Sequence, residues 1–187
     1  EQNGGVAKLK ALAGPYTSLR WMPTGGVNTK NMMDYLGFDK IVACGGTWMV
    51  KKDLINGEKW DEITAICKEA VKTMLGFELR HVGINCADEA EAERTAQLFS
   101  AAFGWDYKPG NSSVFSGTAV ECMKKPYLGE RGHIAVGTNN VDRAVYHLGR
   151  QGITFDESTR KTDGKGKTKA IYLKDSFCGF AVHLVQK

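Results

Sequence analysis

Three histidines and one glutamate recur at equivalent positions in two similar segments, and together they could bind a metal ion. His81 begins the run His-Val-Gly-Ile-Asn, and His133 begins the run His-Ile-Ala-Val-Gly. Glu121 in Ala-Val-Glu-Cys and His183 in Ala-Val-His-Leu form a second equivalent pair. Three imidazoles and one carboxylate suit a divalent cation that keeps open positions for substrate oxygens. If the two segments close around one cleft, the pattern predicts a metal site.

A second group of residues could bind an anion. It consists of two glycine pairs, each beside a threonine: Thr24, Gly25, Gly26, Gly45, Gly46 and Thr47. Each pair follows a short apolar run and precedes a helix-like segment, which is typical of a loop between a buried strand and a helix. Glycine lets backbone N–H groups approach an anion closely, and a helix N-terminus adds a favourable dipole. The pattern indicates a phosphate site, and the alternative is a pair of ordinary tight turns.

The elements around these loops indicate the end of an α/β domain in residues 1–75. Apolar runs at 19–22 and 41–44 predict neighbouring parallel strands whose carboxyl ends share one edge of a sheet. Helical periodicity occurs around residues 6–13, 29–36 and 60–74. These segments make about two and a half βα units of the eight that a (β/α)8 barrel needs, and 47–50 would be the short extra helix of a phosphate site.

From Phe77 onward the sequence contains an internal repeat. Each copy predicts a strand, a helix and three short strands, which gives two βαβββ modules in residues 77–187. The short strands are expected at 105–108, 113–115 and 118–123 in the first copy, and at 154–156, 170–173 and 180–185 in the second. Residues 158–169 are expected to form a loop. Its basic residues, Arg160 among them, favour a solvated hairpin tip over a lid for an anionic substrate.

The first 75 residues resemble the C-terminal portion of 2-keto-3-deoxy-6-phosphogluconate (KDPG) and 4-hydroxy-2-oxoglutarate (KHG) aldolase, a class I (β/α)8 barrel. The matching motifs are Asn-Gly-Gly, Pro-Thr-Gly-Gly, Gly-Gly-Thr-Trp and Trp-Asp-Glu-Ile-Thr, in the same order and spacing. In that family the threonine of Pro-Thr-Gly-Gly lies near the substrate carboxylate, and the glycine-rich loops hold the phosphate. The resemblance carries these roles to Thr24, Gly25, Gly26, Gly45, Gly46 and Thr47. It also implies a 2-keto acid or sugar-acid phosphate as substrate, no cofactor for this part, and a homo-oligomer, commonly a trimer.

A class I aldolase needs a lysine whose amine attacks the substrate carbonyl, normally from the carboxyl end of a barrel strand. The lysines of residues 1–75 lie elsewhere: Lys40 precedes its strand, and Lys8 and Lys10 belong to the first helix. In the family this lysine lies a few residues upstream of the point that corresponds to Glu1. We therefore expect the chain to be the C-terminal part of a longer lyase, and to lack aldolase activity alone.

Residues 77–187 resemble the vicinal oxygen chelate superfamily of glyoxalases, extradiol dioxygenases and some epimerases. Its metal ligands come from the first and last strands of each module, which implies His81, Glu121, His133 and His183 here. The last-strand ligand is usually glutamate, so His183 is a departure that would change the charge and the choice among Zn, Mn, Ni and Fe. The alternative is a set of ordinary strand-end histidines on a fold that has lost its metal.

Composition argues against several classes of binding partner and of cysteine site. The net charge of +4 comes from interleaved acidic and basic residues, so neither nucleic acid nor a membrane surface is indicated as a partner. The five cysteines contain no Cys-x-x-Cys pair, which argues against a disulfide framework or a thiolate zinc site and favours reduced thiols in the cytoplasm.

Three functional hypotheses follow from these patterns. The first is a Schiff-base aldolase with a fused metal domain. The second makes the C-terminal domain the active unit, as a metal-dependent isomerase, lyase or dioxygenase. The third makes that domain a non-catalytic binding module.

Overall fold

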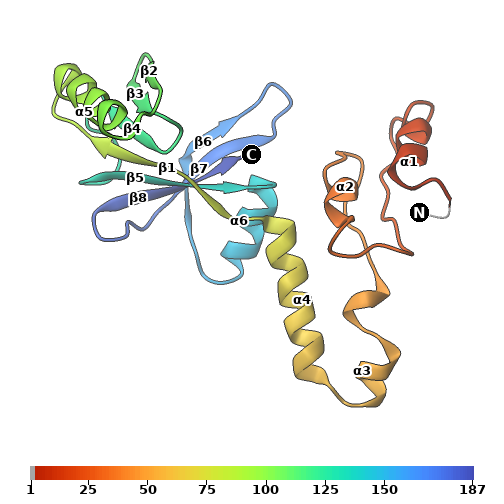
Figure 1. Ribbon diagram of the computed structural model, residues 1–187. Coiled ribbons are helices and arrows are strands. Elements are labelled where there is room, and N and C mark those ends of the chain that lie inside the picture. Colours follow the sequence, from red (N-terminus) through yellow and green to blue (C-terminus); the bar gives the residue numbers. More distant parts are fainter. Residues whose placement is uncertain (1–2) are drawn as a thin grey trace. The chain divides into compact units, whose positions relative to one another are not determined.

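The computed structural model describes residues 3–187, which divide into two compact units (Figure 1). The first unit ends at Leu75, and the second runs from Gly76 to Lys187. Among the described helices, none has the length and apolar character needed to cross a bilayer.

The N-terminal unit is mainly helical. Its elements are α1 (Gly5–Ala13), α2 (Met32–Leu36), the 3-10 helix η1 (Thr47–Met49), α3 (Lys52–Asn56) and α4 (Trp60–Leu75). Its core consists of buried apolar side chains from α2 and from the segments on either side of it: Val27, Met32, Tyr35, Leu36 and Ile41.

The two apolar runs of this unit pair in parallel, as the sequence predicts, but over a short length. Trp21 and Ile41 form an isolated parallel bridge. The Val42 amide donates to the Trp21 carbonyl at 3.1 Å, and the Gly45 amide donates to the Pro23 carbonyl at 3.1 Å. The pairing therefore brings the two glycine-rich loops to the same end of the two segments.

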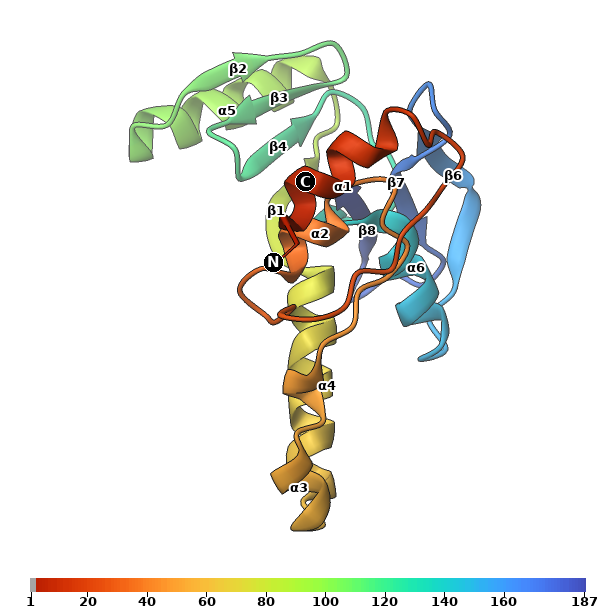
Figure 2. The ribbon, with the colours of Figure 1, turned by 90° about the vertical axis from the view of Figure 1, so that its right-hand side faces the viewer.

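The C-terminal unit is built on one mixed sheet of eight strands in the order β2-β3-β4-β1-β5-β8-β7-β6. The first module comprises β1 (Glu78–Asn85), α5 (Glu89–Phe103), β2 (Tyr107–Pro109), β3 (Ser113–Ser116) and β4 (Val120–Met123). The second comprises β5 (Gly132–Thr138), α6 (Val141–Gly149), β6 (Phe155–Thr162), β7 (Thr168–Leu173) and β8 (Phe180–Gln186). Figure 2 shows α5 lying along β2 and β3.

The strand pairing confirms the two predicted βαβββ modules. The first strand of each module pairs in parallel with the last strand of the same module, β1 with β4 and β5 with β8. The two first strands, β1 and β5, pair antiparallel at the centre of the sheet. This pattern relates the modules by an approximate two-fold axis, so equivalent residues of the two copies lie near the β1–β5 junction.

Both module helices begin at side-chain caps. The Asp88 carboxylate accepts from the Glu91 amide, and the Asn140 side chain accepts from the Arg143 amide. Such caps satisfy amides that the first turn leaves unpaired. Small buried residues, Ala92 and Ala96 of α5 and Ala144 of α6, let the helices approach the sheet closely.

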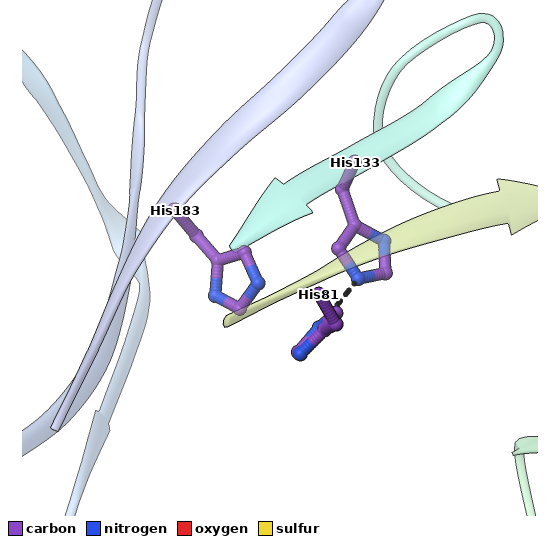
Figure 3. Close-up of side chains that lie close together, drawn as sticks. All are labelled: His81, His133 and His183. Atoms are coloured by element: carbon purple, nitrogen blue, oxygen red, sulfur yellow. Dashed lines mark hydrogen bonds between the residues drawn. The ribbon is translucent and has the colours of Figure 1, made fainter. Parts of the chain in front are cut away.

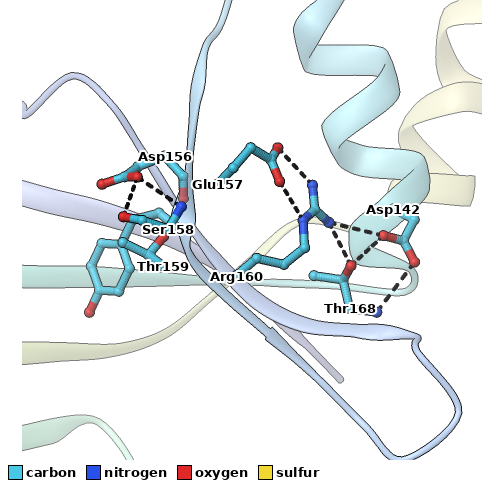
Figure 4. Close-up of polar contacts among 8 residues, drawn as sticks. Asp142, Asp156, Glu157, Ser158, Thr159, Arg160 and Thr168 are labelled. Atoms are coloured by element: carbon cyan, nitrogen blue, oxygen red, sulfur yellow. Dashed lines mark hydrogen bonds and ion pairs between the residues drawn. The ribbon is translucent and has the colours of Figure 1, made fainter.

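The predicted loop at 158–169 is wrong. Strand β6 continues to Thr162 and β7 starts at Thr168, so only residues 163–167 connect them. Arg160 is thus a strand residue. Its guanidinium donates to both carboxylate oxygens of Glu157, at 2.7 and 2.9 Å, and forms an ion pair with Asp142 of α6 at 3.3 Å (Figure 4). These contacts hold a polar segment in the sheet.

The same cluster joins α6 to the outer strands of the second module. The buried Thr168 hydroxyl donates to the Asp142 carboxylate and accepts from Arg160 at 2.6 Å (Figure 4). The Asp142 carboxylate therefore accepts hydrogen bonds from one buried hydroxyl and one partly buried guanidinium.

We expect Asp142→Ala to lower the free energy of unfolding by about 1–2 kcal/mol, because it leaves the buried Thr168 hydroxyl without its acceptor. Urea denaturation followed by circular dichroism measures the change. Asp106→Ala is the matched control, since Asp106 is exposed and its ion pair with Lys108 is 3.8 Å long, and it should cost less than about 0.5 kcal/mol. Equal losses in the two variants would contradict the role given to Asp142.

Candidate metal centre

The four predicted ligands lie in two adjacent rows across the central strands of the sheet. In one row His81 pairs with Ala135, which pairs with His183. In the other row Glu121 pairs with Gly83, which pairs with His133. Residues paired directly across strands point to the same face, and so do residues two positions apart on one strand. The register therefore puts all four side chains on one face of the sheet.

Polar atoms from three of the four side chains lie close together. The Nε2 atoms of His81 and His133 and the Oε2 atom of Glu121 each lie 3.1 Å from the other two. Ligand atoms bound at about 2.0–2.2 Å to one ion lie roughly 3 Å apart. The triangle thus has the spacing of three donors around a shared cation.

Hydrogen bonds alone do not account for this triangle. A neutral imidazole carries one N–H and an ionised carboxylate carries none. If both Nε2 atoms are protonated, both can donate to Glu121 Oε2, but the contact between the two nitrogens then has no hydrogen to share. If only one is protonated, a single hydrogen must serve more than one contact. A cation at the centre would satisfy all three donors at once.

The His183 ring lies beside the rings of His81 and His133 (Figure 3). One ligand atom from each of His81, His133 and His183 can be chosen so that all three lie within 4.8 Å of one another. His183 is buried, and among the described residues neither of its ring nitrogens has a hydrogen-bond partner. Burial, together with the neighbouring His133 and His81, lowers its pKa to about 3, so the ring is neutral at pH 7. Unpartnered buried nitrogens of a neutral imidazole fit a metal ligand.

Glu121 is held as an anion. Burial alone would raise its pKa, but hydrogen bonds from His133, His81 and Ser113 outweigh burial and hold the pKa well below its usual value. The Ser113 hydroxyl on β3 donates to Oε1 at 2.6 Å, which leaves Oε2 for the cluster. Orientation of a ligating carboxylate by a neighbouring hydroxyl is common around protein metal sites.

Small residues opposite the imidazoles make room for the cluster. A Cβ at Gly83 would lie 2.1–2.5 Å from ring atoms of His133, which is closer than side chains can approach. The equivalent position in the second module is Ala135, which is fully buried. The sequence analysis did not single out Gly83, although the parallel between His-x-Gly and His-x-Ala in the two copies could have indicated it.

Aromatic side chains border the cluster at equivalent positions of the two modules. Phe115, which pairs with Glu121, contacts the His81 ring edge-on, with 5.5 Å between the ring centroids. Tyr172, which pairs with His183, stacks on the His183 ring, with 4.6 Å between the ring centroids. Burial raises the pKa of Tyr172 to about 12, so its hydroxyl is neutral. Neither residue was predicted from the sequence as part of the site.

The side chains of the cluster differ in their exposure to solvent. The side chains of His81 and Glu121 are 16% and 14% exposed, whereas that of His133 is 4% exposed. His81 and Glu121 are therefore the members of the cluster nearest to solvent, while His133 is buried.

The predicted anion-binding residues lie in the N-terminal unit, and half of them line a cleft. This cleft has a volume of about 740 Å³, and its lining includes Thr24, Gly25, Gly26 and the Lys8 side chain of α1. Both glycines have positive φ, 82° and 73°. Lys8 adds positive charge to the cleft, a role that the sequence analysis did not give it.

The second glycine loop lies next to the first without lining that cleft. A Cβ at Gly45 would lie 3.6 Å from the Thr24 methyl carbon. At Gly46 a Cβ would lie 2.0 Å from the Trp48 ring, so this position requires glycine for space. Among the described residues, Gly45, Gly46 and Thr47 are not part of the cleft lining.

The N-terminal region is similar to known proteins. Residues 1–66 match the family model "Aldolase: KDPG and KHG aldolase". The 2-dehydro-3-deoxy-phosphogluconate aldolase of Haemophilus influenzae is 51% identical over 71 residues, which are 38% of this chain and 34% of the relative. The KHG/KDPG aldolase of Escherichia coli K12 is 42% identical over 72 residues, which are 38% and 34% of the two chains. The chain thus spans about a third of the length of these curated relatives.

Solved structures resemble the C-terminal domain at low sequence identity. Methylmalonyl-CoA epimerase from Mycobacterium tuberculosis is 15% identical, with a TM-score of 0.43 over 60% of this chain and 89% of the epimerase. Homoprotocatechuate 2,3-dioxygenase from Arthrobacter globiformis is 10% identical, with a TM-score of 0.41 over 58% of this chain and 35% of the dioxygenase.

The strand order of the chain itself carries the fold assignment, since two βαβββ modules joined through β1 and β5 are the vicinal oxygen chelate arrangement. The chain therefore joins a segment similar to KDPG and KHG aldolases, in residues 1–66, to a C-terminal domain with the vicinal oxygen chelate fold.

Proposed function

We propose that this chain is the C-terminal part of a class I aldolase that cleaves KDPG or KHG to pyruvate and an aldehyde, with a fused metal-binding domain. The family match of residues 1–66 carries this proposal. Cleavage by such an enzyme passes through an imine between a lysine amine and the substrate carbonyl. A homo-oligomer, commonly a trimer in this family, is part of the proposal.

In this proposal the N-terminal unit provides the substrate-binding end of the aldolase site. Thr24 orients the substrate carboxylate, and the loops of Gly25, Gly26, Gly45, Gly46 and Thr47 hold the phosphate of a phosphorylated substrate. The cleft supports this assignment, because Thr24 and its glycine pair line it together with the Lys8 cation. Fixed hydrogen-bond donors and a positive charge are the features that bind anionic groups.

The metal domain is the second candidate for activity, and the triangle of donor atoms favours it. His81, Glu121, His133 and His183 would hold a divalent ion, with Zn, Mn, Ni and Fe as the candidates. When bound, such an ion polarises substrate oxygens and stabilises negative charge that develops on them. The protein's own contribution is to fix the donors, to orient Glu121 through Ser113 and to border the site with Phe115 and Tyr172.

The aldolase proposal is tested with a chimera in which the matching 71 residues replace the C-terminal third of the Haemophilus influenzae enzyme. We expect the chimera to cleave KDPG and to trap pyruvate upon borohydride reduction, seen as a mass increase, whereas the 187-residue chain alone traps none. Thr24→Ala in the chimera should lower kcat/KM by about 10- to 100-fold, as loss of a transition-state contact does.

Thr29→Ala is the matched control in the chimera, because Thr29 is exposed and has no proposed role. It should leave kcat/KM within about twofold, as surface substitutions usually do. A folded chimera without KDPG cleavage, or equal losses from Thr24→Ala and Thr29→Ala, would contradict the proposed role of this unit.

Metal binding is tested by removing one ligand at a time. We expect the chain to bind one divalent ion, and His133→Ala and His183→Ala to weaken that binding at least tenfold, since changes even beyond the ligands cost 10- to 100-fold. Isothermal titration with Zn²⁺ and Mn²⁺, together with metal analysis after dialysis, measures the change. His147→Ala on α6 is the control and should bind normally. Unchanged metal affinity in both ligand variants would overturn the site. If the activity of the protein survives in both variants, the C-terminal domain is better explained as a non-catalytic module.

Gly83→Ala tests whether the space beside His133 matters. The added Cβ must displace the imidazole, so metal affinity should fall by about 10- to 100-fold although no ligand is removed. Gly149→Ala is the control, because a Cβ there meets no atom within 4 Å. The same titrations apply, and an unchanged affinity in Gly83→Ala would show that the ring position observed here is not the binding position.

A further inference from the structure

The cleft of the N-terminal unit contains a single charged side chain. Among the described residues that line it, Lys8 is the only one with a charge, and no carboxylate faces Lys8 across the cleft. A lone cation attracts an anionic ligand and repels a cationic one. The cleft of about 740 Å³ is therefore suited to a small anion.

The side chain of Lys8 runs back toward the beginning of α1. A Cβ added at Gly4, the N-cap of this helix, would lie 3.0 Å from Lys8 Cβ and 3.5 Å from Lys8 Cδ, so the aliphatic stem of Lys8 lies over Gly4. Long side chains in helices usually point in this direction. Asn3 and Gly5, the neighbours of Gly4 in sequence, line the cleft. The stem thus leads toward the part of the cleft that the beginning of α1 borders.

The positive charge of Lys8 is not used within the unit. Helix α1 contains no acidic residue, and among the described residues no carboxylate forms an ion pair with Lys8. The other lysine of α1, Lys10, is exposed and does not line the cleft. The two lysines of one helix therefore differ in a way that an experiment can use.

The glycine pair adds hydrogen-bond donors to the same cleft. Among the described residues, neither the Gly25 amide nor the Gly26 amide donates to a protein acceptor. The Gly26 carbonyl accepts from the side-chain amides of Asn28 and Asn31, at 3.2 and 3.0 Å, which holds the loop in place. Successive backbone amides in a turn bind anions, and lysine is a common phosphate ligand. These donors and Lys8 line one cleft.

We propose that Lys8 is a specificity-determining residue that pairs with the phosphate of a phosphorylated 2-keto-3-deoxy sugar acid. The inference rests on the aldolase activity of the proposed function and decides between its two substrates. KDPG and KHG share the 2-keto carboxylate, which the proposed function gives to Thr24. At the other end KDPG carries a phosphate monoester, with a charge of about −1.5 to −2 at pH 7, whereas KHG carries a carboxylate. A cation at that end attracts the phosphate more strongly.

The first test uses the 187-residue chain and glycerol phosphate, a phosphate monoester without a keto group. Prior treatment with EDTA prevents the probe from binding through a metal ion in the C-terminal domain. A titration followed by ³¹P NMR measures Kd. We expect Lys8→Gln to raise Kd at least about tenfold, because a charge-assisted hydrogen bond is lost. Lys10→Gln is the matched control and should stay within about twofold, as surface substitutions usually do.

The second test measures substrate selectivity in the chimera with the Haemophilus influenzae enzyme. We expect Lys8→Gln to lower kcat/KM for KDPG at least about tenfold and kcat/KM for KHG less than about threefold, because only KDPG loses a phosphate contact. Lys10→Gln should leave both values within about twofold.

The outcomes separate this inference from the proposed function. A folded chimera that cleaves neither substrate defeats the proposed aldolase activity and the inference with it. If the chimera is active but Lys8→Gln weakens KDPG and KHG cleavage equally, the aldolase proposal stands and the inference is overturned. Equal affinities of Lys8→Gln and Lys10→Gln for glycerol phosphate, or no binding by the unaltered chain, also overturn it. Should the chimera fail to fold, the titration of the 187-residue chain decides.

Discussion

The antiparallel pairing of β1 with β5 is the constraint on which the candidate site depends. It sets His133 directly opposite Gly83 and His81 opposite Ala135. A shift by one residue would turn each imidazole to the other face of the sheet. The close approach of the His133 ring to the Gly83 backbone is possible only because Gly83 has no Cβ. The β1–β5 register and the absence of a Cβ at Gly83 therefore decide whether the four candidate metal ligands come together.

The approximate two-fold symmetry is kept by the backbone and broken by the side chains. Glu121 with Ser113 in the first module corresponds to His183 with Ala170 in the second, and Phe115 corresponds to Tyr172. The two differences occur together: where the second module has an imidazole in place of a carboxylate, it also lacks the hydroxyl that would orient a carboxylate. The residue at position 183 thus sets the charge of this side of the centre, and position 170, its neighbour in the sheet, offers no hydroxyl that a carboxylate there could use.

Sequence reasoning succeeded where a pattern repeats and failed where contacts are long-range. The repeated order of one strand, one helix and three short strands predicted both modules, and the matching strand runs predicted the equivalence of the four ligand positions. The extent of β6 was missed, because residues 158–162 look like a polar loop and are held in the sheet through Arg160 by Asp142, which is eighteen residues away. Gly83, Ser113 and Tyr172 were missed because their importance lies in which residue they face across the sheet.

The hydrogen-bonding of the cluster argues against a site that has lost its metal. A buried polar atom without a partner costs about 1–3 kcal/mol, and among the described residues His133 Nδ1 and both nitrogens of His183 are in this position. Apolar residues of similar volume would remove that cost, as replacements of buried ionic clusters elsewhere show. A fold with no use for the metal would gain stability by such replacement. A bound cation would offset part of that cost, because it would take one of the two His183 nitrogens and ligand binding to the native state adds to its stability. His133 would bind through Nε2, so its Nδ1 would stay without a partner.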